Sequence, residues 1–173
     1  VDRIETPALR LIALRPEELR ALIAGDTRRA GELVGVAFPE AWPLEQDARD
    51  GLPWHLAHLE KGEAERAWRV RVVVLRVSNR VIGSVGLKGP PDFLGDVEIG
   101  WGIDPEHRRC GRGREAALAL LTWAAAEPGV RSFSATIADD NVPSQRLAAT
   151  LGMLRSIETR RGLPLWRRPA QQS

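Results

Sequence analysis

The chain has 173 residues, of which 43% are hydrophobic and 28% are charged, and these values are typical of one globular domain with its own core. No apolar run approaches the ~20 residues of a membrane-spanning helix, and the opening residues VDRIETPALR lack the features of a signal peptide. A single cysteine excludes an internal disulfide and a cysteine-based zinc cluster. We therefore expect one domain over residues 1–173, located in the cytoplasm, with no membrane partner.

The charged residues argue against a nucleic-acid partner. The formal net charge is only +2, and the arginines are scattered among Asp and Glu instead of forming one basic run. Nearly all of the basic residues are arginine, and the only lysines are Lys61 and Lys88.

The first part of the chain predicts a strand, a helix and then an interrupted helical region. Residues 8–14 alternate in hydrophobicity and predict a strand. Pro16 opens a helix that carries its apolar side chains on one face, namely Leu19, Leu22 and Ile23. Residues 26–66 contain shorter helical patterns separated by prolines, namely Pro39, Pro43 and Pro53. We expect this region to shape a substrate pocket.

The middle of the chain predicts three consecutive antiparallel strands followed by a long helix. Residues 68–77 and 81–87 are rich in β-branched side chains and predict a hairpin, and residues 97–103 resume the strand pattern. Residues 104–113 are expected to be irregular. Residues 114–127 predict a helix with an apolar face formed by Ala117, Leu120, Leu121 and Ala124.

The last part of the chain predicts a strand, a short helix and a final hairpin. Residues 131–138 alternate and predict a strand, and Asn141 is typical of a helix start. Gly152 stands where a helix C-terminal cap belongs. Residues 154–160 and 163–168 predict two strands, so the order of elements is that of a mixed α/β domain.

The segment Arg108–Arg114, RRCGRGR, lies between a strand and the long helix and is the sharpest chemical feature of the sequence. The first amides of a helix have no intrahelical partner, and the helix dipole places partial positive charge there. Gly111 and Gly113 would let a pyrophosphate approach these amides closely. The alternative is an exposed basic turn in which glycine only relieves backbone strain.

The strand before this turn has two unlike faces. Alternation places Val97, Ile99, Trp101 and Ile103 on one face and Glu98, Gly100 and Gly102 on the other. Two glycines beside a carboxylate leave room for a ligand along the strand. The alternative is a β-bulge in which Glu98 points to water, although a bulge would also free strand amides for a ligand.

A dinucleotide-binding fingerprint is a second interpretation of the glycines. Gly111, Gly113 and Ala116 follow the Gly-x-Gly-x-x-Ala spacing, and Asp139 or Asp140 would be the acid that binds the ribose. That fingerprint should follow its strand directly, whereas seven residues intervene after Ile103. A Walker A loop is excluded because Gly-Lys-Ser/Thr is absent.

Two runs resemble the coenzyme-binding core of the GNAT N-acetyltransferase superfamily: VEIGWGIDPEHRRCGRGREAALALL and IADDNVPSQRLAATLGM. The Arg/Gln-x-x-Gly-x-Gly/Ala signature matches Arg108, Gly111 and Gly113, and the Asn-x-x-Ser/Ala helix start matches Asn141 and Ser144. A weaker similarity covers TPALRLIALRPEEL, VIGSVGLKGPPD and LPLWRR. These segments look like the branch that acetylates ribosomal-protein N-termini and small amines.

The resemblance implies a GNAT-like domain with a central, mostly antiparallel sheet flanked by helices. It implies transfer of an acetyl group from acetyl-CoA to a primary amine, without a metal, and it leaves a homodimer open. The backbone of Trp101, Gly102 and Ile103 would pair with the pantetheine arm. The pyrophosphate would be held by Arg108, Arg109, Cys110, Gly111, Arg112, Gly113 and Arg114, and further coenzyme contacts would come from Asn141 and Ser144.

The sequence departs from the family in one catalytic respect. Many relatives carry a tyrosine in the helix after the asparagine, where this chain has Ala148, and the chain contains no tyrosine at all. A phenol therefore cannot protonate the departing thiolate, so the general acid stays open. A catalytically weak, coenzyme-binding regulatory module is the alternative to an active transferase.

A base is needed as well, because an aliphatic ammonium has a pKa near ~10 and its deprotonation at neutral pH costs about 4 kcal/mol. Glu98 is our candidate, acting directly or through water, while a backbone amide of residues 98–103 polarises the thioester carbonyl.

Other candidate residues have weaker support. His55, His58 and His107 rank below Glu98 as a base and complete no metal site. An acyl-Cys110 route is unnecessary when the amine attacks directly. Three tryptophans are candidates for ligand contact: Trp42, Trp54 and Trp101.

Overall fold

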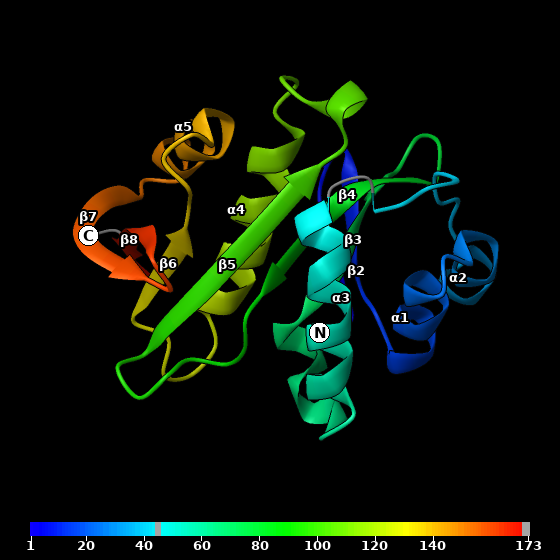
Figure 1. The fold of residues 1–173 in the computed structure, drawn as a ribbon, viewed down its shortest axis with the longest axis horizontal. Helices are drawn as coiled ribbons and strands as arrows, with labels where there is room; N and C mark the ends of the chain where they lie inside the picture. Colours follow the sequence, from blue (N-terminus) through cyan, green and yellow to red (C-terminus); the bar gives the residue numbers. More distant parts are fainter. Residues whose placement is uncertain (44–45, 171–173) are drawn as a thin grey trace.

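A computed structural model describes residues 1–43 and 46–170, and over this part of the chain one eight-stranded sheet forms the centre of the fold (Figure 1). Its spatial order is β1-β2-β3-β4-β5-β6-β8-β7. The strands are β1 (Arg3–Glu5), β2 (Leu9–Ala13), β3 (Val70–Leu75), β4 (Arg80–Leu87), β5 (Asp96–Ile103), β6 (Ser132–Thr136), β7 (Leu154–Arg160) and β8 (Leu163–Pro169). Neighbouring strands are antiparallel except for the parallel pair β5 and β6. The predicted mixed α/β fold with a mostly antiparallel sheet is confirmed.

Helices cover both faces of this sheet. They are α1 (Pro16–Ile23), α2 (Thr27–Val34), α3 (Gln46–Leu59), α4 (Arg112–Ala125) and α5 (Val142–Thr150), with 3-10 turns at Glu63–Trp68 and Pro105–His107. In Figure 1, α3 lies in front of β3 and β4, whereas α4 lies behind β5. Among the described residues, no helix has the length and apolarity to cross a membrane.

Two apolar cores correspond to the two helical layers. The apolar side of α4 contributes four fully buried residues to one core, namely Ala117, Leu120, Leu121 and Ala124. The helices α1, α2 and α3 enclose the other core with the opposite face of β3 and β4. Burial of each large aliphatic side chain contributes about 1.5–3 kcal/mol, so both layers hold the sheet in place.

Four local expectations are wrong. The long helix begins at Arg112, two residues early, because Gly111 takes a left-handed conformation (φ 79°) and caps it. Pro105–His107 forms a 3-10 turn instead of an irregular segment. Helix α3 continues through Pro53, and Ile23 is 43% exposed instead of sharing the buried face of α1. The three-residue strand β1 escaped prediction because so short a segment carries no periodicity.

Candidate functional site

Strands β5 and β6 separate after a short parallel contact. Asp96–Glu98 pair with Ser132–Ser134, and beyond this point β5 pairs only with β4 up to Ile103. Figure 1 shows the two ribbons diverging toward the ends of their arrows. Beyond Glu98, the edge of β5 that faces away from β4 therefore pairs with no described strand, and it faces the region between β5 and β6.

The backbone groups of β5 alternate between its two edges. The Lys88 N–H donates to the Glu98 carbonyl at 2.9 Å, and the Asp104 N–H donates to the Ile82 carbonyl at 2.9 Å. Because polar backbone groups of successive residues in a strand point to opposite edges, Trp101 and Ile103 direct theirs away from β4. The Arg108 Nε donates to the Ile103 carbonyl at 2.7 Å. The separated edge thus offers backbone groups of Trp101 and the N–H of Ile103 to a bound molecule.

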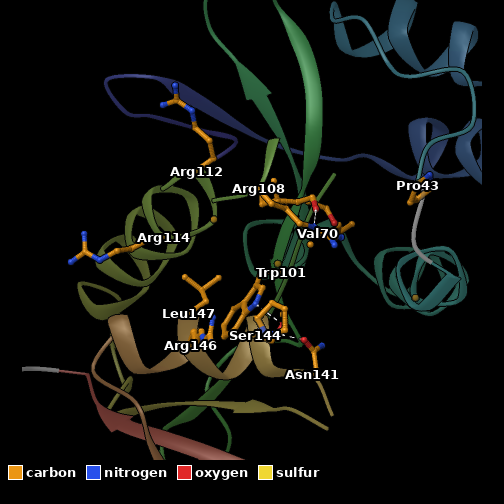
Figure 2. Close-up of a pocket in the computed structure, with 18 of the residues that line it drawn as sticks. Pro43, Val70, Trp101, Arg108, Arg112, Arg114, Asn141, Ser144, Arg146 and Leu147 are labelled. Carbon is orange, nitrogen blue, oxygen red and sulfur yellow. Dashed lines mark hydrogen bonds between the residues drawn. The ribbon is translucent and has the colours of Figure 1, made fainter. Parts of the chain in front are cut away.

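A cavity of about 850 Å³ follows this edge. One half lies between β4, β5 and α3, where the lining includes Leu52, His55, Ser84 and Lys88. The other half lies between the start of α4 and α5 (Figure 2). The expected pocket-forming role of the 26–66 region agrees with the contribution of Leu52 and His55.

The sequence-predicted binding residues line this cavity, most of them in its second half. The lining includes Trp101, Gly102, Ile103, Arg108, Arg109, Gly111, Arg112, Gly113, Arg114, Asn141 and Ser144. Cys110 lies outside the lining, and its exposed thiol is 2.9 Å from the His107 carbonyl. The structure therefore brings all but one of the predicted coenzyme residues to a single cavity, while their binding roles stay predictions.

Gly100 and Gly102 clear the floor of the first half. A Cβ added to either residue would meet nothing within 4 Å, and neither has a positive φ. Gly86, which pairs directly with Gly100, differs because its Cβ would lie 2.8 Å from the Val70 Cα. The absent side chains of Gly100 and Gly102 therefore leave open space for a ligand, as the sequence predicts, and the β4–β5 register runs there without a bulge.

The first turn of α4 forms one wall of the second half. Gly111 provides the left-handed cap, and by helix geometry the amides of the following residues have no partner within the helix. A Cβ on Gly113 would lie 3.2 Å from the Leu147 Cδ2 and 3.5 Å from the Ile103 Cγ1, so this glycine lets α4 approach α5 and β5 closely. The helix end can thus present unpaired amides and partial positive charge to an anion.

Two arginine side chains of this turn are not directed at Trp101. The side chains of Arg112 and Arg114 extend away from it (Figure 2), and the Arg112 Nη1 donates to the Glu115 Oε2 at 3.3 Å. Arg109 holds an unusual positive φ of 62°. The backbone of the turn is therefore its principal contribution to the cavity wall, and the arginines add positive charge around it.

Ser144 makes two hydrogen bonds at the start of α5, one that caps the helix and one that connects it to β5. The Asn141 Oδ1 accepts a hydrogen bond from the Ser144 N–H at 3.2 Å and so caps the helix. The Trp101 Nε1–H donates to the Ser144 Oγ at 3.3 Å (Figure 2). Ala148, one turn further, is fully buried in the core. Ala148 therefore presents no group to the cavity, and Ser144 is a hydroxyl on its wall.

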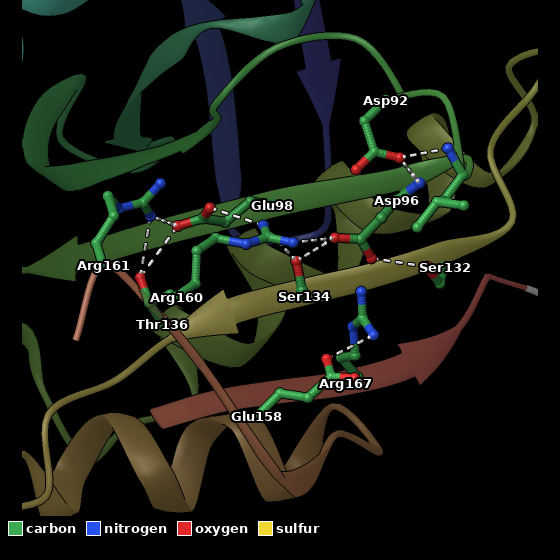
Figure 3. A network of polar contacts seen from close by, with 11 residues as sticks. Asp92, Asp96, Glu98, Ser132, Ser134, Thr136, Glu158, Arg160, Arg161 and Arg167 are labelled. Carbon is green, nitrogen blue, oxygen red and sulfur yellow. Dashed lines mark hydrogen bonds and ion pairs between the residues drawn. The ribbon is translucent and has the colours of Figure 1, made fainter. Parts of the chain in front are cut away.

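Glu98 is occupied by ion pairs. Its carboxylate accepts hydrogen bonds from the Thr136 Oγ1 at 3.0 Å, from the Arg160 Nη1 at 3.0 Å and from Arg161 (Figure 3). Its side chain is 6% exposed, and the alternative in which Glu98 points to water is wrong. Burial alone would raise the pKa of Glu98, but the hydrogen bonds from Arg160 and Arg161 outweigh burial and lower it.

These contacts connect the final hairpin to β5. Arg160 also donates to the Asp96 Oδ2 at 3.1 Å, and Asp96 accepts from Ser132 at 2.7 Å and Ser134 at 2.6 Å (Figure 3). Glu98 lies outside the cavity lining, and a carboxylate with three donors is a weak base. The contacts therefore favour an anchoring role for Glu98, and its role as general base stays a prediction.

His55 and Lys88 are the ionisable residues of the first half that sequence reasoning ranked low or missed. His55 is 8% exposed, and its Nδ1 has no hydrogen-bond partner among the described residues. Burial, with smaller effects of Lys88 and Arg69, lowers the pKa of His55 to about 3, so its imidazole is neutral at pH 7. Gly86 pairs with Gly100, and this register, which no local sequence pattern indicates, places Lys88 on the same face of the sheet as Gly100 and Gly102.

The dinucleotide alternative is wrong. The turn does lie in a parallel βαβ unit, β5–α4–β6, but the fingerprint should follow its strand directly, whereas the 3-10 turn Pro105–His107 separates β5 from Gly111. Asp139, one of its two candidate ribose ligands, forms an ion pair with the Arg155 Nη2 at 2.7 Å.

Comparisons with known proteins agree with this geometry. The acetyltransferase (GNAT) domain family matches residues 8–154. The uncharacterized N-acetyltransferase YjdG of Bacillus subtilis (strain 168) is 30% identical over 151 residues, covering 87% of this chain and 89% of that protein. Among solved structures, the ribosomal-protein-S5-alanine acetyltransferase of Vibrio fischeri has a TM-score of 0.68 at 17% identity, covering 97% and 96% of the two chains. The microcin C7 self immunity acetyltransferase MccE, in complex with acetyl-CoA and AMP, has a TM-score of 0.61 at 11% identity, covering 95% and 93%.

Proposed function

Since the chain belongs to the acetyltransferase (GNAT) family, we propose that it transfers the acetyl group of acetyl-CoA to a primary amine by direct attack. The observation that carries this proposal is the continuous path from the free edge of β5 to the first turn of α4. The acceptor is a small molecule or a protein N-terminus.

The described residues fit the coenzyme. The Trp101 backbone groups and the Ile103 N–H suit the amide groups of a pantetheine arm, which would bind along the strand edge as an added strand does. The amides after Gly111 suit the pyrophosphate, because a helix N-terminus attracts an anion. When bound, the coenzyme supplies an activated thioester carbonyl.

The first half of the cavity, between β4, β5 and α3, is here assigned to the acceptor and called the acceptor half, and it suits an uncharged amine. An incoming ammonium would meet the cationic Lys88, and the neutral His55 would not offset that repulsion. Nearby positive charge and burial both lower the pKa of an amine. We retain Glu98 as the candidate base that removes the remaining proton, directly or through water, and Ser144 as a hydroxyl on the cavity wall that would contact the coenzyme.

Two relatives guide the choice of acceptors. The name of the Vibrio fischeri protein indicates an alanine of a ribosomal protein as its substrate, and YjdG is named as an N-acetyltransferase. Peptides with free N-termini are therefore the first acceptors to test, followed by small amines.

A coenzyme-binding module with little turnover is the second candidate function. The observation that favours it is Ala148, which is fully buried and replaces the tyrosine of many relatives. Turnover separates the two functions, whereas coenzyme binding does not.

A thiol-release assay tests the proposal. The purified chain is incubated with acetyl-CoA and each acceptor, and each product is identified by mass spectrometry. The proposal expects release of one thiol for each acetyl group transferred to at least one amine. Tight acetyl-CoA binding without transfer to any peptide or small amine would favour the binding module.

A further inference from the structure

Lys88 is an amine at the edge of the acceptor half of the cavity. It is one of only two lysines in the chain, and it lines the cavity. The other, Lys61, follows the C-terminal end of α3 and lies outside the lining, and both lysines are exposed. The chain therefore contains one amine inside the candidate site and one matched amine outside it.

The register of β4 and β5 places Lys88 on the face cleared by glycine. Gly86 pairs with Gly100, and the Lys88 N–H donates to the Glu98 carbonyl at 2.9 Å. Residues two apart in a strand share a face, so Lys88 is a diagonal neighbour of Gly100. Diagonal neighbours lie about 7–8 Å apart, which is within reach of a long side chain.

The Lys88 ammonium is held by an aromatic ring instead of an ion pair. Its Nζ lies 5.5 Å from the centroid of the Trp54 ring, and Trp54 also stacks with Arg69 at 4.9 Å. Within residues 1–43 and 46–170, no carboxylate lies within salt-bridge distance of the Lys88 Nζ. A single cation–π contact of this kind is weak, so the amine can leave it to reach the floor over Gly100.

The surroundings favour the free amine of Lys88. Lys88 is exposed, but partial desolvation of its ammonium at the cavity wall lowers the pKa, and the guanidinium groups of Arg161 and Arg69 act in the same direction. Glu98 opposes this shift without reversing it. A larger fraction of Lys88 is therefore present as free amine at neutral pH than for an ordinary lysine.

We propose that Lys88 is a site of self-acetylation, an inference that rests on the proposed use of acetyl-CoA. The free amine of Lys88 attacks the thioester carbonyl carbon, a C–N bond forms, and the C–S bond breaks with its electron pair leaving on sulfur. The nitrogen then loses one proton to solvent, and the thiolate gains one from solvent. The product is an uncharged acetyl-lysine beside Gly100.

This modification changes the acceptor half in two ways. It removes the positive charge of Lys88, which otherwise repels an ammonium, and it adds an acetyl group in the space over Gly100. The added volume obstructs the approach of an external amine. Self-acetylation would thus lower the rate of transfer to other acceptors.

The experiment follows acetylation of the two lysines in the same sample. The full chain is incubated with acetyl-CoA, and peptides containing Lys88 and Lys61 are quantified over time by mass spectrometry. We expect Lys88 to gain one acetyl group at least about tenfold faster than Lys61, because the amine and the thioester are held together. The rate constant should not change when the protein is diluted.

Binding of acetyl-CoA to the wild type and to Lys88→Arg is measured in parallel by calorimetry. Two results would overturn the inference and leave the proposed function intact: binding of acetyl-CoA without acetylation of Lys88, or binding with equal acetylation of Lys88 and Lys61. An absence of binding would overturn both. Lys61→Arg is the control variant and should acetylate Lys88 at the wild-type rate.

Discussion

Gly86 of β4 and Gly100 of β5 lie directly opposite each other, yet different neighbours explain the absence of a side chain at each. The backbone of β3 excludes a Cβ at Gly86, because that atom would lie 2.8 Å from the Val70 Cα. A Cβ at Gly100 would enter open cavity space. One glycine is therefore required by packing, and the other keeps the acceptor half open.

This difference predicts opposite effects for two identical substitutions. Gly100→Ala should keep the fold or stabilise it by about 0.4–1 kcal/mol, since its backbone conformation suits alanine, while transfer to an acceptor falls. Gly86→Ala should destabilise the fold by about 1–3 kcal/mol through overpacking. Denaturant unfolding and the thiol-release assay measure the two effects. Loss of stability in Gly100→Ala, or unchanged transfer, would refute this account of the cavity floor.

Gly111 is expected to be required for the shape of the coenzyme wall. Its φ of 79° disfavours a side chain, so Gly111→Ala should cost about 1–2 kcal/mol and weaken coenzyme binding. Gly111→Asn is the matched variant, since asparagine tolerates this conformation better, and it should recover part of the lost stability. Calorimetry and thermal unfolding measure both variants. Equal affinity in all three proteins would place the pyrophosphate elsewhere.

Glu98→Gln tests the two roles of this carboxylate. If Glu98 is the general base, kcat/KM should fall by roughly 10²-fold or more near neutral pH, with partial recovery at higher pH and unchanged coenzyme affinity. An anchoring role predicts lower stability without a changed pH profile, because Arg160 and Arg161 lose their shared partner.

Arg161→Gln is the companion variant for Glu98. It leaves the carboxylate in place while removing one of its ion pairs. A similar stability loss in both variants, with a pH profile that neither changes, would remove Glu98 from the list of catalytic residues.

His55 should make the stability of the protein depend on pH above the range in which carboxylates titrate. Its folded pKa is about 3, whereas the ordinary value is about 6.5, so the unfolded chain binds more protons between these values. Stability should therefore fall as the pH falls, by about 2 kcal/mol between pH 7 and pH 5. His55→Gln should lose this component in denaturant unfolding. An identical pH dependence in the variant would show that His55 is not held neutral by burial.

Much of the sheet was predictable because its strands alternate in hydrophobicity. The pattern placed Ile99 and Trp101 on one face and Gly100 and Gly102 on the other, and the structure shows this arrangement. The helix start at Asn141 was predictable for a local reason, because a side-chain oxygen satisfies an amide of the first turn.

The acceptor half was less predictable because it depends on contacts distant in sequence. His55 and Lys88 come from α3 and from the residue after β4, and no local pattern indicates that they line one cavity. The arginine partners of Glu98 lie more than sixty residues away in the final hairpin. Alternation predicted the face of this carboxylate, but it could not predict that arginines would occupy it.

Titration calorimetry with acetyl-CoA tests the central claim most directly. The account predicts one binding site per chain for acetyl-CoA, much weaker binding of acetyl-pantetheine, which lacks the pyrophosphate, and no binding of NAD. Gly111→Ala is the matched variant. Its affinity for acetyl-CoA should be reduced, whereas its affinity for acetyl-pantetheine should not change. An absence of binding at millimolar acetyl-CoA by the folded wild-type chain, or equal affinity for acetyl-CoA and NAD, would contradict the account.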